Sequence, residues 1–255
     1  MLRIHADRAT ILGRPLPGDD RPHGLFVARD GFQGWDDTPD AVREAIARPG
    51  THGEYDLPVY MGARVFSIDG HAIAWSDLAL ASLRSTVTGI GAAGGRFQVT
   101  VTHQGQTLRA YARRGGKATF QDKGFRVGRR RASFQVQFVA PDPRKYGDQH
   151  TYAAGEEAIH WGNFPASPVL EVRGPTPPYT IQTSIGRQLT IAQGLGLGQT
   201  HRIELRTGRL YRDGVLQVGA IVGGATWVVP PGLPGVVHTI TGPGALRVWL
   251  PDTYI

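Results

Sequence analysis

Apolar and polar side chains alternate most strictly over residues 134–138, where Phe134, Val136 and Phe138 fall on one face and two glutamines on the other. A period of two residues predicts a half-buried β-strand. The same period recurs over residues 97–102, again with three apolar side chains on one face. Each of these segments is therefore expected to line a hydrophobic core with one side and to face solvent with the other.

One segment has the longer period of a helix. Ser76 is a favourable N-cap, and Gly89 is a residue type at which helices often end. Between them, one side of residues 77–87 is apolar through Leu80, Leu83 and Val87. The sequence therefore predicts an amphipathic helix over 77–87 with this side buried.

Three shorter signals predict local structure. Thr38 followed by Pro39 is typical of the start of a helix, here a short one that would stop before residues 49–50. Asp69-Gly70 lies in an alternating stretch, residues 60–73, and predicts the turn of a hairpin because glycine tolerates positive φ. Asp213-Gly214 predicts a second hairpin turn for the same reason.

The C-terminal part of the chain contains short alternating segments at close spacing. Seven such segments predict strands: residues 169–173, 179–183, 188–192, 202–206, 209–212, 236–241 and 246–250. Many short strands separated by turn residues are typical of a β-sandwich. Residues 148–160, which precede them, are polar and read as a connector.

Composition supports a mainly β protein. The 255 residues include 35 Gly and 18 Pro, which favours many short strands over long helices. There is no cysteine, which excludes disulfides, thiolate nucleophiles and the common zinc-finger ligand sets. No apolar run reaches the roughly 18 residues of a membrane span, and the N-terminus has no apolar signal-peptide core, so no membrane partner is expected.

Positive charge is concentrated in one segment. Residues 96–131 hold ten Lys and Arg against the single acid Asp122, a net +9, whereas the whole chain carries +7. Three interpretations stay open: contacts to nucleic-acid phosphates, a solvated hairpin whose charges protect its strand edges, and ion pairs with acidic segments of another subunit such as Asp36-Asp37 or Glu156-Glu157. Sequence-specific recognition of DNA is not expected.

Candidate chemistry is sparse. No serine lies in a G-x-S-x-G or S-x-x-K motif, no HExxH motif exists, and the adjacent acidic pairs lie in loop-like stretches. The densest group of metal-ligand types, His52, Glu54 and Asp56, has strand-like spacing that does not bring the side chains together. We therefore predict no enzymatic activity, no catalytic residue, no metal and no cofactor. Exposed aromatic residues can stack on sugars, and Trp227 is the candidate for a glycan contact.

Two strings carry a family resemblance. Residues 140–147 read APDPRKYG, a strand end locked by prolines, and residues 161–169 read WGNFPASPV. Together with residues 52–73, which include Gly62-Ala63-Arg64, they resemble the distal tail proteins of long-tailed phages (siphoviruses). The resemblance implies a mainly β fold. It implies a ring-forming domain over 1–147, similar to a β-sandwich or split barrel with one helix and a long hairpin arm, then a linker over 148–160, and a galectin-like β-sandwich over 161–255.

The resemblance also implies a structural function. Six copies would form a ring that joins the tail tube protein to the tail-tip hub, with a lumen for the tape measure protein and DNA. The protein would be assembled in the host cytoplasm, reside at the tail tip of the virion, and hold accessory or receptor-binding proteins. The arm, expected over 103–131, would supply the ring contacts: Arg109, Tyr111, Arg113, Arg114, Lys117 and Phe120. The corner between the domains would consist of Pro141, Pro143, Arg144 and Tyr146. The alternative function is that of a glycan-binding adhesion module using Trp227.

Overall fold

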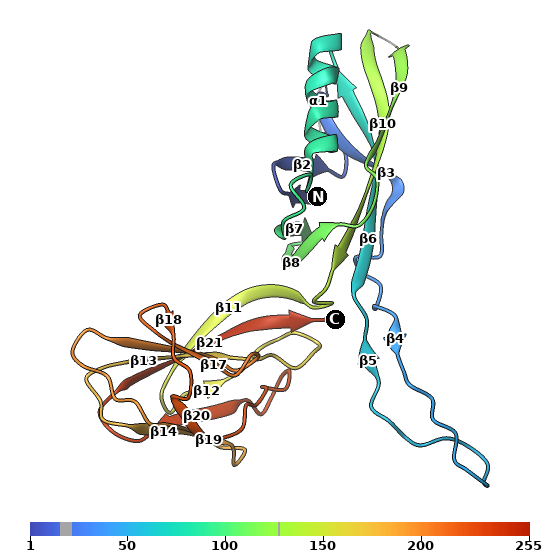
Figure 1. Ribbon diagram of the computed structural model, residues 1–255. Helices are drawn as coiled ribbons and strands as arrows, with labels where there is room; N and C mark the ends of the chain where they lie inside the picture. Colours follow the sequence, from blue (N-terminus) through green and yellow to red (C-terminus); the bar gives the residue numbers. More distant parts are fainter. Residues whose placement is uncertain (16–21, 127) are drawn as a thin grey trace. The chain divides into compact units, whose positions relative to one another are not determined.

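The computed structural model describes residues 1–15, 22–126 and 128–255, with the side chain of Arg126 left out. The chain divides into two compact units, Met1–Lys145 with Ile255, and Tyr146–Tyr254. Both are built from β-strands, and the described residues contain one α-helix, α1 (Figure 1). The prediction of a mainly β protein with one helix is therefore confirmed.

The first unit is a closed, mixed β-barrel. Seven of its described strands follow one another in the order β8-β7-β1-β2-β3-β6-β10, and β10 pairs back with β8 to close the circle. All these pairs are antiparallel except β2 with β3. The barrel strands are β1 Arg3–Ala6, β2 Ala9–Leu12, β3 Gly24–Gln33, β6 Arg64–Ala74, β7 Phe97–His103, β8 Gln106–Arg114 and β10 Arg129–Ala140.

The barrel is filled by the alternating residues that the sequence singles out. Phe134, Val136 and Phe138 of β10 are all buried, as are Val99 and Val101 of β7. The Phe138 ring stacks on Phe66 with 5.0 Å between centroids, and Trp35 meets Phe66 edge-on at 5.1 Å. A closed barrel leaves no free strand edge around its circumference, so its strands enclose this aromatic core.

Helix α1, Asp77–Gly89, lies against β6, β10 and β9 (Thr119–Arg126). The Ser76 side chain accepts a hydrogen bond from the backbone N–H of Ala79 at 3.2 Å, as an N-cap does. Leu80 and Val87 are buried and Leu83 is half-buried. The predicted helix, its cap and its buried side are confirmed, and the helix extends two residues further than expected.

Two local predictions are wrong. No helix follows Thr38: the chain instead forms β4, Ala41–Val42, which pairs with β5, Tyr60–Met61. A helix this short is marginal because its nucleation is costly, whereas strand pairing satisfies part of the backbone. Asp69-Gly70 forms no turn either, because β6 runs straight through it. Gly70 is needed there for packing, since an added Cβ would lie 2.3 Å from the Phe134 ring and 2.6 Å from the Phe26 carbonyl.

The second unit contains two sheets that enclose one core. One sheet has the order β18-β17-β16-β13-β21-β11 and the other β12-β20-β14-β15-β19. The strands are β11 Lys145–Ala153, β12 Glu157–Ala158, β13 Val169–Arg173, β14 Tyr179–Thr183, β15 Gln188–Ile191, β16 Thr200–Glu204, β17 Arg209–Arg212, β18 Val215–Leu216, β19 Ile221–Gly224, β20 Val236–Ile240 and β21 Ala245–Tyr254. Buried residues of both sheets form a single cluster, as in a sandwich.

All seven C-terminal segments predicted as strands are strands, within a few residues at their ends. Asp213-Gly214 is the predicted turn, with positive φ at both residues, and it joins β17 to β18. Residues 148–160, expected to be a linker, instead contain most of β11 and all of β12, which pair within the second unit. Alternating strand signals are weak in this stretch because polar residues fill both of its faces.

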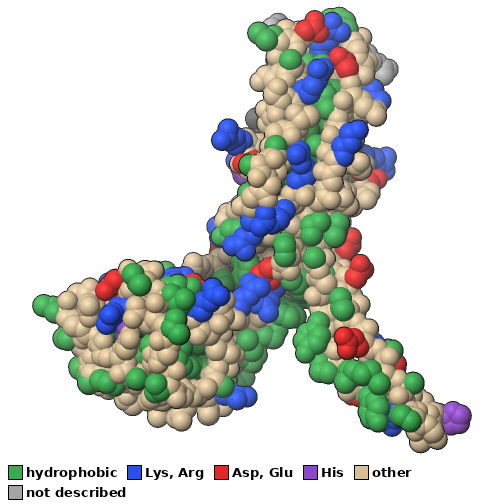
Figure 2. Space-filling model, viewed as in Figure 1, with side chains coloured by type: hydrophobic (Ala, Val, Ile, Leu, Met, Phe, Trp, Pro, Cys, Tyr) green, Lys and Arg blue, Asp and Glu red, His purple; other side chains and the backbone are tan. Residues whose placement is uncertain are grey.

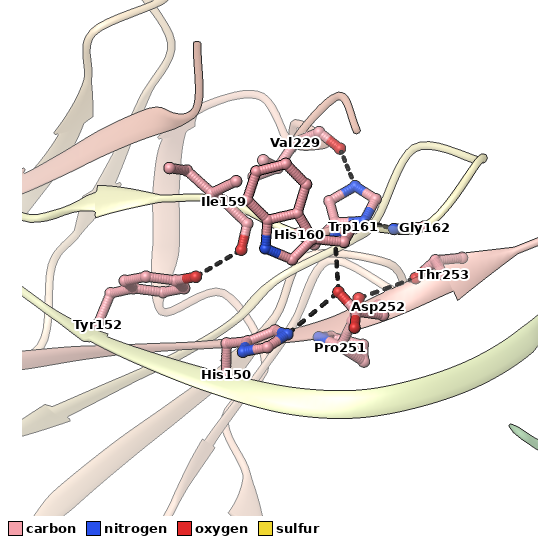
Figure 3. A network of polar contacts seen from close by, with 10 residues as sticks. All are labelled: His150, Tyr152, Ile159, His160, Trp161, Gly162, Val229, Pro251, Asp252 and Thr253. Atoms are coloured by element: carbon pink, nitrogen blue, oxygen red, sulfur yellow. Dashed lines mark hydrogen bonds and ion pairs between the residues drawn. The ribbon is translucent and has the colours of Figure 1, made fainter. Parts of the chain in front are cut away.

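A polar network anchors the start of the 161–169 string (Figure 3). The Asp252 carboxylate of β21 accepts from the backbone N–H of Trp161 at 2.7 Å and contacts His150 Nε2 of β11 at 3.1 Å. Gly162 lies so close to β21 that an added Cβ would be 1.9 Å from the Thr253 carbonyl oxygen. The glycine of this string is therefore required by close backbone packing.

Three histidines are fully buried in the second unit. Desolvation lowers the pKa of His160 and His201, and it lowers the pKa of His238 to about 4. His238 Nε2 lies 3.0 Å from Trp227 Nε1, which donates to it, so this ring is held as a neutral acceptor. Burial thus favours the neutral form of all three rings.

Gly70→Ala should destabilise the barrel by roughly 1–3 kcal/mol, because the added methyl group collides with the Phe134 ring and with backbone. Urea unfolding followed by tryptophan fluorescence measures the change. Gly89→Ala is the matched control, since an added Cβ there meets no atom within 4 Å, and it should be neutral or stabilising. Equal stability of the two variants would contradict the packing role of Gly70.

Acid should weaken the second unit well before carboxylates titrate. An unfolded histidine takes up a proton near pH 6.5, whereas His238 resists it until about pH 4, so stability falls as the pH drops through this window. His238 alone should cost roughly 3 kcal/mol by pH 4. Urea midpoints at pH 7, 6 and 5 test this. His238→Gln should flatten the slope, and an unchanged slope in this variant would contradict the assignment to His238.

Candidate assembly interface

A two-stranded segment leaves the barrel between β3 and β6 (Figure 1). We call residues 38–63 the projecting hairpin. β4 and β5 pair at its base, a bridge joins Ala47 to Glu54 further out, and Tyr55 N–H donates to the Ile46 carbonyl at 3.0 Å. The predicted arm over 103–131 consists mainly of β8, β9 and the start of β10, and its role in ring contacts stays a prediction.

The projecting hairpin exposes a row of apolar side chains, seen with its acidic side chains in Figure 2. Tyr60 is 69% and Val42 is 54% exposed, and these two residues face each other across the β4–β5 pair. The other exposed large apolar residues of the hairpin are Ile46, Tyr55, Val59 and Met61. An exposed apolar row of this kind marks an interaction surface.

The hairpin is also acidic. Four acids, Asp40, Glu44, Glu54 and Asp56, stand against two arginines, a net charge of −2 over residues 38–63. Arg43 forms an ion pair with Glu54, and Arg48 lies over the Tyr55 ring at 5.6 Å. Asp40, Glu44 and Asp56 are exposed.

One buried arginine holds both ends of the hairpin. The Arg64 side chain is 1% exposed, and its guanidinium donates to four backbone carbonyls. Nη1 donates to Gly34 at 3.3 Å, to Trp35 at 2.9 Å and to Asp37 at 2.5 Å, and Nε donates to Pro143 at 2.8 Å. The chain entering the hairpin, the chain leaving it and the end of the corner after β10 therefore meet at one side chain.

Lys145 lies beside Arg64, and we call these two residues the clamp. Its Nζ donates to the Trp35 carbonyl at 2.8 Å and lies 3.8 Å from the Asp36 carboxylate. Burial lowers the pKa of Lys145, as does the neighbouring positive charge of Arg64, while Asp36 and Asp37 act against both effects. Burial also lowers the pKa of Arg64, and the same two acids oppose it. Two buried cations and two acids thus balance at the root of the hairpin.

The outer face of β1, β7 and β8 is positively charged. The described strands β1, β2, β7 and β8 contain no Asp or Glu at all. Cross-strand partners share a face, so the register places Arg3, Arg109, Tyr111 and Arg113 outward, with Arg96 just before β7 opposite Arg113. We call Arg3, Arg96, Arg109, Tyr111 and Arg113 the basic wall.

The predicted ring-contact residues are not gathered on one arm. Arg109, Tyr111, Arg113 and Arg114 belong to β8 of the barrel, Lys117 lies in the loop after it, and Phe120 lies on β9. The Arg96 guanidinium covers the Tyr111 ring at 5.0 Å, and Arg113 donates to the Gly94 carbonyl. Arg114 donates to the Thr88 carbonyl at 2.8 Å, at the C-terminal end of α1, where a cation is favourable. Their role in oligomer contacts stays a prediction.

Cations of the basic segment also surround the start of α1. Arg130 pairs with Asp77 at 2.6 Å and lies over the Phe125 ring, and Arg129 lies over Trp75. Arg126, which the sequence analysis includes in this segment, has its side chain outside the described residues. Six arginines of this segment are thus placed at two locations: Arg96, Arg109 and Arg113 on the basic wall, and Arg114, Arg129 and Arg130 near the ends of α1.

The predicted corner lies where the two units divide. Pro141 and Pro143 follow the last residue of β10, and the Pro143 carbonyl accepts from Arg64. Arg144 N–H contacts the Asp142 side chain at 3.4 Å, and Tyr146 OH accepts from Arg206 at 2.9 Å within the second unit. Whether these residues fix an angle between the units stays a prediction.

Trp227, the candidate glycan contact, does not lie on the surface. It is 5% exposed, belongs to the core cluster of the second unit and donates to His238. Its ring therefore has no open face for a sugar, which corrects the sequence-based assignment. The exposed tryptophan of this unit is Trp161, at 64%.

The part of the chain that the structure describes shows no group of three or more His, Asp or Glu side chains that are placed to hold a metal ion. Within the same residues, no helix has the length and apolar character to cross a bilayer.

Sequence comparisons find no relative: no family model matches the chain, and no curated protein matches it. Comparison with solved structures does find similar proteins. The crystal structure of the SPP1 Dit (gp 19.1) protein, described as a paradigm of the hub adsorption apparatus in phages that infect Gram-positive bacteria, matches with a TM-score of 0.71 at 14% identity, and the match covers 100% of both chains. The chain shares the fold of this phage distal tail protein.

A chain in the baseplate of phage p2, in its activated conformation with Ca, matches more distantly, with a TM-score of 0.51, 8% identity and 97% coverage of both chains. The same baseplate with Sr matches equally well. The fold of the SPP1 Dit protein therefore spans both units of this chain, at a sequence identity of only 14%.

The sequence analysis predicts neither the projecting hairpin nor the contacts of the clamp. Gly62-Ala63-Arg64 was noted only as part of the family resemblance, and the contacts of Arg64 join residues that are 27 to 79 positions away. One feature of the sequence could have indicated the hairpin. It is an acidic stretch between two predicted strands in which apolar residues show no regular spacing.

Arg64→Leu should destabilise the first unit by about 3–5 kcal/mol, because four carbonyls lose a buried donor and Asp36 and Asp37 lose a counter-charge. Urea unfolding measures the loss, and limited proteolysis should cut residues 38–63 faster. Arg64→Lys keeps the charge without the planar fork and should recover only part of the stability. Full stability in Arg64→Lys would show that charge alone suffices.

Proposed function

We propose that the protein is a structural distal tail protein of a siphovirus and has no enzymatic function. In this proposal six copies form a ring that joins the tail tube protein to the hub at the tail tip. The lumen passes the tape measure protein and then DNA. The protein is assembled in the host cytoplasm, becomes part of the virion tail tip, and holds accessory or receptor-binding proteins. The observation that carries the proposal is the full-length likeness to the SPP1 Dit fold.

The geometry of the first unit supports an assembly role. A closed barrel is a rigid body, and the clamp of Arg64 and Lys145 fixes a hairpin to it that exposes apolar side chains on a two-stranded ribbon. Such a ribbon is marginally stable on its own and gains stability when another surface covers it. A neighbouring subunit supplies that surface in a ring.

The residues predicted from sequence as ring contacts fit this proposal in a revised form. Arg109, Tyr111 and Arg113 lie on the barrel wall, so they offer a flat surface to a neighbour instead of reaching toward it. Deleting residues 112–118 would not test the contact cleanly. It would remove the buried Ala112 and the hydrogen bond from Gly115 N–H to the Gln137 carbonyl, and so damage the barrel itself.

The alternative function, a glycan-binding adhesion module, loses its proposed contact because Trp227 is buried.

Solution mass tests the proposal. The purified protein, alone or with the tail tube or hub protein as template, should form a species near six times 27.6 kDa, about 166 kDa, with an open centre in negative-stain images. Removing residues 45–56 shortens the projecting hairpin without touching the clamp or β4 and β5, and should leave folded monomers. A monomer that persists with both partners present would contradict the ring.

A further inference from the structure

One side of the sandwich in the second unit ends in two short strands that carry no charge. β18 is the last described strand of one sheet and β19 the last of the other, and only residues 217–220 join them (Figure 1). Residues 214–246 contain no Asp, Glu, Lys or Arg. We call residues 215–222 the uncharged edge. Sheet edges are usually protected by charged side chains or proline, and this segment has neither.

The uncharged edge also exposes large apolar side chains. Val218 is 89%, Val215 65%, Val222 62% and Leu216 45% exposed. A segment rich in β-branched residues, without charge or proline, is an aggregation hazard when it lies at the end of a sheet. Such a surface is therefore expected to be covered by another chain.

Backbone contacts fix the position of the uncharged edge. Gln217 N–H donates to the Leu210 carbonyl at 2.9 Å, and the Gln217 side chain donates to the Val215 carbonyl at 3.0 Å. Ala220 is buried, and its carbonyl accepts from Ala192 N–H at 2.9 Å. The backbone is thus held on both sides of Val218, so this side chain is presented to solvent by an ordered segment.

The charges beside the edge limit the chemistry of the partner. Arg202 lies opposite Tyr211, and Tyr211 lies opposite Leu216, so these three side chains share the outer face of the sheet up to its end. Residues 200–213 hold four arginines against two acids. A complementary partner therefore combines apolar side chains, which cover the edge, with acidic side chains that face the arginines.

These features disfavour a second copy of this chain as the partner. Two copies that paired through the same edge would bring their arginine-rich β16 and β17 strands toward one another. They would also be related by a twofold axis, which neighbours in a six-membered ring are not. The occupant should therefore be a different protein.

We propose that the uncharged edge binds an extended, apolar and acidic segment of an accessory or receptor-binding protein by strand addition. The added segment continues the sheet from β19, the longer of the two end strands, and its backbone pairs with the groups that β19 directs away from β15. Main-chain hydrogen bonds supply affinity in this mode, and alternate side chains supply specificity. The inference rests on the proposed function and names the surface that holds the accessory protein.

A single cysteine locates the occupant. The chain has no cysteine, so Val218→Cys carries one unique thiol to which a benzophenone maleimide can be attached. Leu233→Cys is the matched control: Leu233 is 70% exposed, and nearby Gly235 N–H donates to Glu157 of β12, at the opposite end of the same sheet. In purified tails that contain the labelled chain, light should cross-link position 218, and not position 233, to one segment of an accessory protein.

A charge at the edge tests the energetics. Val218→Glu places a carboxylate where the partner contributes apolar and acidic side chains, so the affinity of rings for the cross-linked accessory protein should fall about tenfold or more. Leu233→Glu should bind like the wild type. Both substitutions are at exposed positions, and mass photometry should show unchanged rings in both variants.

The outcomes separate this inference from the proposed function. Cross-linking of position 218 to a second copy of this chain, or no more strongly than position 233, would overturn the inference and leave the ring intact. Equal affinity of Val218→Glu and wild-type rings for the accessory protein would overturn it as well. If the wild type forms no ring with the tube and hub proteins present, the proposed function itself fails.

Discussion

The first unit depends on a single buried guanidinium. Arg64 begins β6 at the point where the chain returns from the projecting hairpin, and it donates to carbonyls of the segment that enters the hairpin and to the Pro143 carbonyl after β10. The planar guanidinium holds five N–H donors in a fixed geometry, whereas an ammonium group has three rotatable donors on one atom. Burying such a cation is costly, and Asp36 and Asp37 offset part of that cost. This arrangement is what allows a long ribbon to leave a barrel without loosening it.

Barrel closure and the clamp each stabilise a different part of the first unit. The closed strand order of the seven barrel strands leaves no free edge among them, and close contacts such as that of Gly70 with Phe134 hold β6 against β3 and β10. The clamp then fixes both ends of the projecting hairpin to the barrel. A surface carried on a fixed root loses less conformational entropy on association than one on a free loop, so a modest contact area is enough for specific assembly.

The features that could be predicted from sequence are those set by nearby residues. The alternation at Phe134, Val136 and Phe138, the Ser76 cap and the Asp213-Gly214 turn each depend on fewer than about six consecutive positions, and each is confirmed. The turn predicted at Asp69-Gly70 is wrong because the same dipeptide also suits a strand position where there is no room for a side chain. The contact that excludes a side chain there is with Phe134, which is distant in the sequence. The hairpin clamp and the burial of Trp227 depend on contacts between distant segments in the same way.

The distribution of charge over the surface also depends on contacts between distant segments. The sequence showed that residues 96–131 are strongly basic but left three interpretations open, because a linear count does not say which side chains share a surface. In the folded unit, some of these arginines are engaged by α1 and its neighbouring loop, as with Arg114 at the Thr88 carbonyl and Arg130 at Asp77. The barrel register gathers others on one acid-free wall. The projecting hairpin itself carries four acids against two arginines, so the first unit presents opposite net charges on two separate surfaces.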